Sequence, residues 1–431
     1  MRSRWGSLGA AMAELKPLRA LHYNLLKTGG LQDVVAPPYD VIDADQRAEL
    51  EARSPFNVVR LDLPVGDDPY GEAARMLALW REDGVLVADD APALWPIEQD
   101  YTGPDSARRT RRGFFARVRV EEYGAGRIRP HERTHPGPKE DRLRLTRATQ
   151  TNLSPIFSLF SDPHRAAWSA LEGARTEMPW AQTEDDDGTV NRLWRVSDAE
   201  AIETVTGALA GTELLIADGH HRYETARVYA EEIGGEGEHR YVLMCLVALE
   251  DPGLTVFPTH RLLRDLLPEQ HETLAQAIRR DFEISELDST DDLVPTPGEP
   301  VRLGYIDAHF RRPFMLTLRD QATADAALPG HSAPYRRLDT AVLEALILKG
   351  ALGMSDDDID HLNGLGYARS FQEALDLVQG GGYDAGFFMA PTPIEHVQAV
   401  AAEGESMPPK STYFFPKVPT GLLFSPLARE S

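Results

Sequence analysis

Runs of apolar residues along the chain predict a mixture of strands and helices. Residues 241–249 are apolar almost without interruption, which is typical of a strand buried on both faces. Further strands are expected over residues 57–63, 93–101, 113–122, 155–160, 213–217, 301–306 and 385–389, and helices over residues 70–83, 140–149, 222–233, 269–280 and 338–352. Because the two kinds of element are intermixed without a regular strand–helix–strand repeat, the pattern predicts an α+β fold with a mixed α/β sheet.

The length of the chain, 431 residues, predicts more than one lobe, because single cores rarely grow beyond ~250–300 residues. We expect an N-terminal α/β lobe over residues 15–100, a catalytic core over residues 101–265, and a C-terminal α/β lobe over residues 266–431 whose tail returns to the site. Residues 1–14 carry two arginines but no apolar signal-peptide region, so they are expected to form a disordered leader.

Charge and cysteine content narrow the class of protein. The formal net charge of −23 argues against a nucleic-acid-binding surface, which needs clustered Lys and Arg, and against binding to anionic lipid. No stretch approaches the ~18 uncharged apolar residues of a membrane helix. The single cysteine, Cys245, excludes disulfides and a cysteine zinc site, and it is expected to fill the core. These features together predict a soluble cytoplasmic protein that binds neither nucleic acid nor membrane.

The densest chemical signal lies between an expected strand and an expected helix, in the sequence Asp218-Gly219-His220-His221-Arg222. A helix N-terminus offers an anion free backbone N–H groups and a favourable dipole. Gly219 lets the backbone approach a ligand closely. The two histidines and the arginine supply hydrogen-bond donors, and Asp218 could hold a metal or orient a hydroxyl. In the ordinary alternative Asp218 is the helix N-cap, but so many ionisable residues in so short a segment favour an anion site.

Residues 131–135 read HERTH, which formally matches the H-E-x-x-H pattern of zinc peptidases. That pattern works on a helix, where histidines four residues apart share one face. Pro136 disfavours helical angles at His135, so we interpret the match as coincidental. Two interpretations remain: Glu132 is a carboxylate base on a turn beside His131, or the segment is a solvated charged turn.

Two more polar segments stand near expected strands. Residues 257–261 (FPTHR) follow the buried strand, and residues 408–417 (PPKSTYFFPK) place basic and hydroxyl side chains between prolines. Each could complete an anion site, and each could equally be a polar strand edge or an ordinary loop. The candidate side chains are Thr259, His260, Arg261, Lys410, Ser411 and Thr412. Five of the 13 histidines fall in the four polar segments taken together (His131, His135, His220, His221 and His260). The sequence therefore favours one shared site over several unrelated ones.

These segments together resemble a known family. The motifs are VVAPPYDVI, RPHERT followed by KEDRL, TNLSPIF, ADGHHRYETA, FPTHR and MPPKSTYFFPKVPTGL. They resemble those of the bacterial and archaeal domain-of-unknown-function family 1015. The DGHHR segment is also similar to the signature of the ParB/sulfiredoxin superfamily, and in particular to its free-serine kinases. The resemblance implies a ParB/sulfiredoxin-like core with additional N- and C-terminal lobes.

The resemblance also implies an activity and a set of roles. The reaction would transfer a phosphoryl group to the hydroxyl of free L-serine, giving O-phosphoserine, with Mg²⁺ and with pyrophosphate, ADP or ATP as donor. Glu132 would be the base, and Asp218 the carboxylate that orients a metal or the hydroxyl. The implied phosphate ligands are Gly219, His220, His221 and Arg222, with His221 also placed among the catalytic residues, and the side chains Thr259, His260, Arg261, Lys410, Ser411 and Thr412 are implied to lie nearby.

Two alternatives belong to other functional classes. A ParB-like regulatory module would bind a nucleotide through the same DGHHR segment without turnover. A zinc hydrolase would use His131 and His135, against which Pro136 argues. The partners expected for the first hypothesis are small molecules, L-serine and a phosphate donor, and the oligomeric state is left open, a homodimer included.

Overall fold

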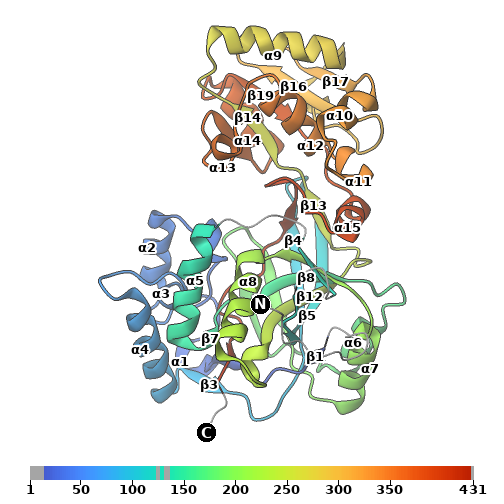
Figure 1. The fold of residues 1–431 in the computed structure, drawn as a ribbon. Helices are drawn as coiled ribbons and strands as arrows, with labels where there is room; N and C mark the ends of the chain where they lie inside the picture. The colour runs from blue at the N-terminus through green and yellow to red at the C-terminus, as the bar shows by residue number, and fades with distance from the viewer. Residues whose placement is uncertain (1–13, 123–126, 131–135, 429–431) are drawn as a thin grey trace. The chain divides into compact units, whose positions relative to one another are not determined.

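The computed structural model describes residues 14–122, 127–130 and 136–428. These residues form two compact units. The first unit contains the described residues up to 254 together with residues 416–428, and the second unit consists of Thr255–Phe415. The second unit is therefore inserted, along the sequence, between two parts of the first (Figure 1).

A mixed sheet forms the centre of the first unit. Its strands follow the order β6 (Ile128–Pro130), β11 (Leu214–Asp218), β8 (Ile156–Phe160), β12 (Tyr241–Ala248), β5 (Arg108–Arg119), β4 (Trp95–Thr102), β10 (Val190–Leu193) and β9 (Ala181–Glu184), and β1 (Leu15–Lys16) also pairs with β5. The pairs β6–β11 and β8–β12 are parallel and the other pairs are antiparallel. The expected mixed α+β class is thus confirmed. The lobe boundary expected after residue 100 falls inside β4, which pairs with β5 along its whole length.

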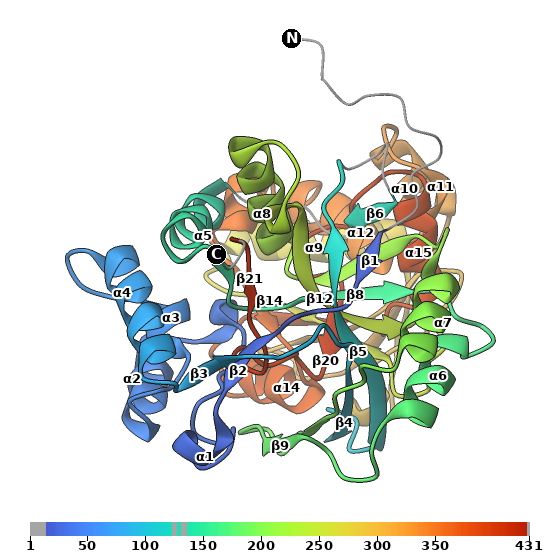
Figure 2. The same cartoon turned by 90° about the horizontal axis from the view of Figure 1, so that it is seen from below.

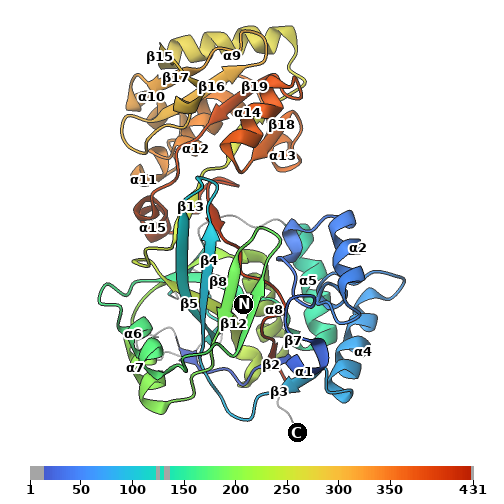
Figure 3. The same ribbon diagram turned by 180° about the vertical axis from the view of Figure 1, so that it is seen from behind.

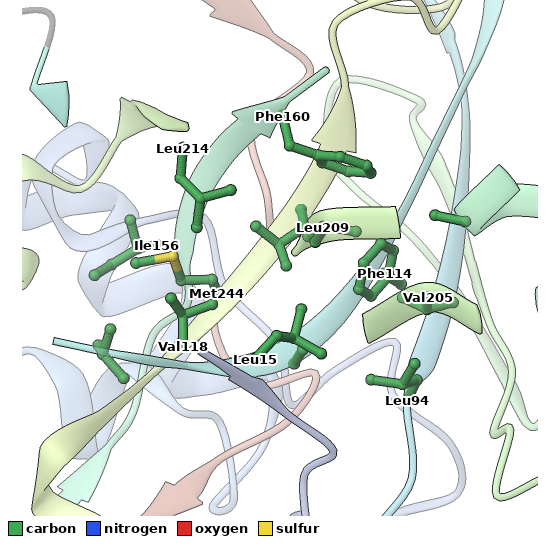
Figure 4. Close-up of a cluster of buried hydrophobic side chains, with 14 of the residues drawn as sticks. Leu15, Leu94, Phe114, Val118, Ile156, Phe160, Val205, Leu209, Leu214 and Met244 are labelled. Atoms are coloured by element: carbon green, nitrogen blue, oxygen red, sulfur yellow. The ribbon is translucent and has the colours of Figure 1, made fainter. Parts of the chain in front are cut away.

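Helices α6 (Ala166–Ala174) and α7 (Ala199–Leu209) cover one face of this sheet. Strand β12 runs through the middle, and its alternate residues Val242, Met244 and Leu246 point into the covered core. Figure 4 shows Met244 and Phe114 from the sheet packed near Val205 and Leu209 of α7. The apolar run expected to be a buried strand is buried because both of its faces are covered.

A row of helices packs in sequence beside the sheet (Figures 1 and 3). Neighbours in the row are α2 (Ala44–Arg53), α3 (Val59–Asp62), α4 (Pro69–Glu82), α5 (Pro136–Thr149) and α8 (His220–Ile233). The smaller elements of this unit are β2 (Leu21–Tyr23), α1 (Leu25–Thr28), the 3₁₀ turns Tyr39–Val41 and Glu238–Arg240, β3 (Leu86–Ala88), β7 (Thr151–Asn152) and β21 (Ser425–Pro426). Helix α8 is the member of the row that follows β11 directly, so it starts at the C-terminal end of that strand.

One expected strand is a helix. Residues 57–63 alternate like a strand, but they contain α3. The reason is Asn57, which is fully buried and whose side chain accepts a hydrogen bond from the Val59 N–H at 3.0 Å. Its amide group also donates to the carbonyls of Asp33 and Val35, so the turn is fixed by tertiary contacts. A short apolar run alone does not distinguish the two conformations.

The second unit has its own sheet of six strands. Their order is β15 (Phe282–Glu286), β17 (Phe314–Leu318), β16 (Arg302–Asp307), β19 (Ala385–Phe388), β14 (His260–Leu263) and β18 (Leu365–Ala368), while β13 (Thr255–Phe257) pairs separately with β20 (Tyr413–Phe415). Its helices are α9 (Pro268–Asp281), α10 (Gln321–Ala327), α11 (Ala333–Arg336), α12 (Asp339–Leu343), α13 (Asp356–Asp360), α14 (Phe371–Gln379) and α15 (Ile394–Ala402), with a 3₁₀ turn at Thr290–Asp292. The single helix expected over residues 338–352 is divided, since α12 continues as a π-helix over Glu344–Lys349.

The tail of the chain rejoins the first unit (Figure 2). Thr420 bridges to Ala36, and Phe424 bridges to Leu21. Strand β21 then pairs with β7. These pairings fix the backbone of residues 416–428 against segments from early in the chain.

Two expectations from composition can be compared with the structure. Among the helices of the described residues, none combines the length and the apolar character needed to cross a membrane. Cys245 lies on β12 with no exposed surface, and burial raises the pKa of its thiol to about 12. Its expected role as a core residue is therefore confirmed.

Candidate functional site

The turn from β11 into α8 carries the densest cluster of ionisable residues. Asp218 is the last residue of the strand, and Gly219 follows as the helix N-cap with φ of 94°. Helix α8 begins at His220, two residues before the expected start. Because Gly219 is the N-cap and makes no side-chain cap, the carboxylate of Asp218 is not used for capping. The ordinary interpretation of Asp218 as an N-cap does not hold.

Two cations share the Asp218 carboxylate. Arg222 Nη2 donates to Asp218 Oδ2 at 3.1 Å, and Lys417 Nζ lies 3.4 Å from Asp218 Oδ1. Burial acts to raise the pKa of this carboxyl, but the charges of Lys417, Arg222 and His220 outweigh it and hold the pKa well below its usual range. Asp218 is therefore ionised throughout the neutral range.

The Arg222 guanidinium is held by two partners, the Asp218 carboxylate and the Pro155 carbonyl. Its side chain is 9% exposed, and Nη1 donates to the carbonyl of Pro155, just before β8. Burial lowers the pKa of Arg222, but the charges of Asp218, Asp40, Tyr39 and Asp62 together outweigh it, so the pKa lies above its usual value. Arg222 Nε is buried and has no hydrogen-bond partner among the described residues.

A small cavity of about 40 Å³ adjoins Arg222 in the first unit. Asp62 lines it, and its carboxylate accepts hydrogen bonds from Arg142 Nη1 at 3.2 Å and Ser154 Oγ at 3.0 Å. Thr225 Oγ1 also lies in this wall and is buried without a partner. The cavity thus has two buried polar atoms, on Arg222 and Thr225, to which no group of the described residues is hydrogen-bonded.

The cavity brings together segments that are far apart in the sequence. The Tyr39 ring lies over the Arg142 guanidinium, with 4.2 Å between the ring centre and the guanidinium carbon. Ser154 Oγ lies 2.9 Å from Thr420 Oγ1. These residues come from the motifs VVAPPYDVI, KEDRL, TNLSPIF, ADGHHRYETA and KVPTGL. Five of the quoted motifs therefore meet within one unit, beside Arg222.

Six of the candidate residues belong to the second unit instead. His260 is buried, and its Nδ1 accepts a hydrogen bond from the Met389 N–H at 3.1 Å. Burial lowers the pKa of His260 to about 4, so the ring is neutral at pH 7. Arg261 is buried too, and donates to the carbonyls of Thr259 and Pro409. These hydrogen bonds to backbone groups indicate a structural role for His260 and Arg261 within the second unit.

The lysine and hydroxyl candidates of residues 410–412 also lie in the second unit, just before β20. Ser411 is buried, donating to Thr340 Oγ1 at 3.1 Å and to the carbonyl of Pro408. Lys410 has a positive φ of 58°, which marks a tight turn. Thr412 is half-buried next to β20. Ser411 is therefore held by residues of its own unit.

The base expected from the sequence cannot be placed. Glu132, together with His131 and His135, lies outside the described residues. Within the described ranges, no group of three or more His, Cys, Asp or Glu side chains is arranged to hold a metal ion.

A second cavity, in the second unit, has a different character. It measures about 870 Å³ and lies between α9 and the face of β15, β17 and β16. Its walls are largely apolar, with Leu274, Ile278, Phe314 and Leu316 among them. None of its lining residues belongs to the quoted motifs, so the cluster around Asp218 is the stronger candidate for the site.

A family described as "Protein of unknown function (DUF1015)" matches residues 15–341. The chain belongs to this family. The resemblance drawn from the motifs is thereby confirmed, although the matched residues end before the PPKSTYFFPKVPTGL segment. No curated protein matches the chain in sequence.

Several solved structures are similar to this one. A conserved hypothetical protein from Pyrococcus furiosus has a TM-score of 0.35 at 15% identity, over 68% of this chain and 90% of that one. A free serine kinase in complex with AMP has a TM-score of 0.34 at 14% identity, over 67% and 83%. SbnI with a C-terminal truncation, from Staphylococcus aureus, has a TM-score of 0.36 at 13% identity, over 72% and 86%. At these TM-scores the likeness carries no argument about function, and the ParB/sulfiredoxin-like core stays a prediction.

Several residues of the cluster were not identified as site residues from the sequence. Lys417, Arg142, Ser154 and Tyr39 all lie inside quoted motifs, which was the available signal. Their places in the cluster depend on contacts between segments that are far apart in the sequence, and a local sequence pattern does not predict such contacts.

Proposed function

We propose that this protein is a small-molecule kinase that transfers a phosphoryl group from pyrophosphate, ADP or ATP to the hydroxyl of free L-serine. The products are O-phosphoserine and the donor shortened by one phosphate. The acceptor rests on the similarity of the DGHHR segment to the free-serine kinases. The phosphoryl-transfer chemistry rests on the geometry around Asp218.

The observation that carries the proposal is the pair of cations on Asp218 at the start of α8. Arg222 and Lys417 place two cations on the one carboxylate of Asp218. The N-terminus of a helix adds free N–H groups and the positive end of its dipole. Such a place favours an anion with several acceptor oxygens, as a phosphate group has.

Phosphoryl transfer needs positioning and charge stabilisation above all. In the proposed reaction, the serine hydroxyl oxygen attacks the terminal phosphorus in line, and the bond from that phosphorus to the bridging oxygen breaks. Arg222 and Lys417 stabilise the negative charge on the transferred oxygens. The hydroxyl proton passes to a base, for which Glu132 is the candidate that the resemblance supplies.

Asp218 is suited to orienting a substrate group and not to accepting the proton. Its pKa lies far below neutral pH, and a base with so low a pKa contributes little at pH 7. An ionised carboxylate can instead accept a hydrogen bond from the serine hydroxyl or ammonium group. The resemblance allows Asp218 to orient either a metal or the hydroxyl. We therefore assign it to the hydroxyl.

The described residues do not fit a resident Mg²⁺. Both oxygens of Asp218 face cations, and the described chain holds no acidic cluster with ligand geometry. Mg²⁺ commonly binds through substrate phosphates and keeps several waters. In this proposal Mg²⁺ therefore enters as part of the donor, bound to its phosphates, and belongs to the substrate.

The test is a phosphoserine assay with L-serine and Mg²⁺, run in parallel with pyrophosphate, ADP and ATP. Formation of O-phosphoserine with at least one donor supports the proposal and identifies that donor. The matched acceptors are L-threonine and D-serine, which check whether the hydroxyl amino acid is recognised. Nucleotide binding without phosphoserine from any donor would contradict it and favour the regulatory-module alternative.

A further inference from the structure

The cavity between α9 and the sheet of the second unit has the size of a small-molecule site. Its volume of about 870 Å³ falls in the range of roughly 300–1,000 Å³ that such sites occupy. One wall is a single face of α9, with the residues His271, Leu274, Ala275, Ile278 and Arg279. The other wall is the face of β15, β17 and β16 (Figure 1).

Large apolar side chains stay exposed at this cavity. Phe310 is 70% exposed and Ile284 is 40% exposed, and both line it. Leu267, which precedes the lining residue Pro268, is 63% exposed. A ligand that covers such side chains gains the hydrophobic free energy of their burial. The cavity therefore favours a ligand with an apolar body.

Two carboxylates line one end of the cavity. Asp307 is the last residue of β16, and Asp384 immediately precedes β19, the neighbouring strand. Asp307 Oδ1 accepts hydrogen bonds from the N–H groups of His309 and Phe310. Asp384 Oδ2 accepts one from the Leu266 N–H at 2.9 Å. Among the described residues, the second oxygen of each carboxylate has no hydrogen bond and neither carboxylate has an ion pair.

The arginines that are close in sequence to these carboxylates have other partners. Arg311 Nε donates to a backbone carbonyl at 3.3 Å, and Arg312 pairs with Glu286 at 3.2 Å. Arg264 lies 3.9 Å from the carboxylate of Asp265. The acidic end of the cavity is therefore not neutralised by a direct ion pair within the described chain.

The arginine of the lining stands at the other end of the cavity. The hydrogen bond from Leu266 to Asp384 places the start of α9 beside the carboxylates. Eleven residues of α9 separate Pro268 from Arg279, which is about 16 Å of helix axis at 1.5 Å per residue. The cavity thus has an acidic end, an apolar middle and one arginine far from the acids.

Tyr305 adds an aromatic ring and a hydroxyl group at the acidic end. Tyr305 and Asp307 are two residues apart on β16, so their side chains share one face of the sheet. Burial, together with the charge of Asp307, raises the pKa of the Tyr305 hydroxyl, which stays protonated at neutral pH. A cation over an aromatic ring is attracted by the ring's negative face.

We infer that this cavity binds a small apolar molecule with a primary ammonium group, the ammonium at Asp307 and the apolar body against Leu274 and Leu316. An ammonium group has three donors and no acceptor, so it matches free carboxylate oxygens and a hydroxyl oxygen. The lining histidines can accept from it as well as donate. A ligand carboxylate would instead meet two like charges at this end. The inference does not depend on the kinase activity, because none of these residues belongs to the Asp218 cluster.

The test compares three ligands that share one apolar body and differ in the head group. Octylammonium, octanoate and 1-octanol are titrated into the full chain by calorimetry, at matched ionic strength and below the concentration at which they aggregate. We expect octylammonium to bind at least about tenfold more tightly than either of the others. Octanoate that binds as tightly as octylammonium would overturn the proposal.

The variant Asp307→Asn removes the charge and keeps an oxygen to accept the two backbone N–H groups. The matched control is Asp320→Asn, because Asp320 also accepts a backbone N–H in this unit but does not line the cavity. We expect octylammonium to bind at least about tenfold more weakly to Asp307→Asn and within about twofold of wild type to Asp320→Asn, with 1-octanol unchanged in both. Wild-type affinity in Asp307→Asn, or equal losses in the two variants, would overturn the assignment of the ammonium.

A second pair of variants tests the apolar wall and remains informative if Asp307→Asn does not fold. Ile284 and Leu362 are each 40% exposed in the second unit, and Ile284 lines the cavity whereas Leu362 does not. Ile284→Gln should weaken octylammonium by at least about threefold, and Leu362→Gln should leave it unchanged. Equal affinities in the two variants would overturn the proposal. Failure of all three ligands to bind, with a dimer in sedimentation, would also overturn it and assign the cavity to a second copy of the chain.

Discussion

Lys417 Nζ lies 3.4 Å from Asp218 Oδ1, although the whole second unit separates the two residues along the chain. The lysine reaches the carboxylate because the tail of the chain is fixed by backbone bridges at Thr420 and Phe424. The charges around Asp218 therefore come from both parts of the first unit, the part before the second unit and the part after it.

Replacement of Lys417 by methionine removes one of the two cations on Asp218. Because a single donor to a developing oxyanion is worth roughly a factor of 100 in rate, we expect Lys417→Met to lower kcat/KM for the donor by about 100-fold. Steady-state kinetics with varied donor measure the effect. The control is Lys27→Met, which removes a lysine bound to the carbonyl of Asp83 and should leave the kinetics unchanged. Equal kinetics in wild type and Lys417→Met would remove Lys417 from the site.

Replacement of Asp218 by asparagine leaves Arg222 and Lys417 without their shared carboxylate. Removing one partner of a buried ion pair costs roughly 3 kcal/mol, so Asp218→Asn should lower both turnover and the free energy of unfolding. Denaturant unfolding and the phosphoserine assay measure the two effects. The control Asp186→Asn breaks an exposed pair with Arg53 and should cost about 1 kcal/mol or less. A stable and fully active Asp218→Asn would contradict the assignment.

Alanine variants at Gly219 and at a control glycine can separate a loss of stability caused by backbone strain from a loss of activity caused by a displaced Arg222. Its φ of +94° disfavours any side chain, and an added Cβ would lie 3.0 Å from Arg222 Nε. The matched control is Gly29, with φ of +73° and no atom within 4 Å of an added Cβ. We expect both alanine variants to lose roughly 1–2 kcal/mol of stability. Only Gly219→Ala should also lose kcat, and equal activity of the two variants would show that Arg222 need not keep its position.

The elements around the site could largely be predicted from the sequence. Strand β12 and helix α8 were expected because long runs with one clear period allow few alternatives. Helix α3 was not expected, because its conformation depends on the tertiary hydrogen bonds of Asn57. The start of α8 was placed two residues late, since the positive φ at Gly219 is a local detail that periodicity does not encode.

The sequence predicts part of the cluster that the structure forms around Asp218. The DGHHR segment was identified because ionisable residues are dense after an apolar strand. Lys410 was selected from the tail, whereas the lysine that contacts Asp218 is Lys417. Both lysines stand among prolines and aromatics, and only the pairing of β13 with β20 decides which of them belongs to the first unit.

Asp185 predicts a distinct dependence of stability on pH. Burial raises the pKa of its carboxyl to about 7, from an ordinary value of about 3.9. Between these two values the folded state binds more protons than the unfolded state. The free energy of unfolding should therefore gain a contribution as the pH falls from about 7 to about 4.

The measurement is thermal or denaturant unfolding of wild type and Asp185→Asn across that pH range. The variant should lose this contribution and show a smaller rise, or a steeper fall, towards pH 4. Asp67→Asn, in an exposed loop, should behave like wild type. Parallel curves for wild type and Asp185→Asn would refute the assigned shift.

The insertion of the second unit has a consequence for synthesis. A ribosome that has just completed residue 415 has made all of β11 and α8 but none of the tail. At that moment Asp218 has Arg222 but not Lys417, and the backbone partners of Ala36 and Leu21 do not yet exist. The full set of cations around Asp218 can thus form only after the whole second unit has been synthesised.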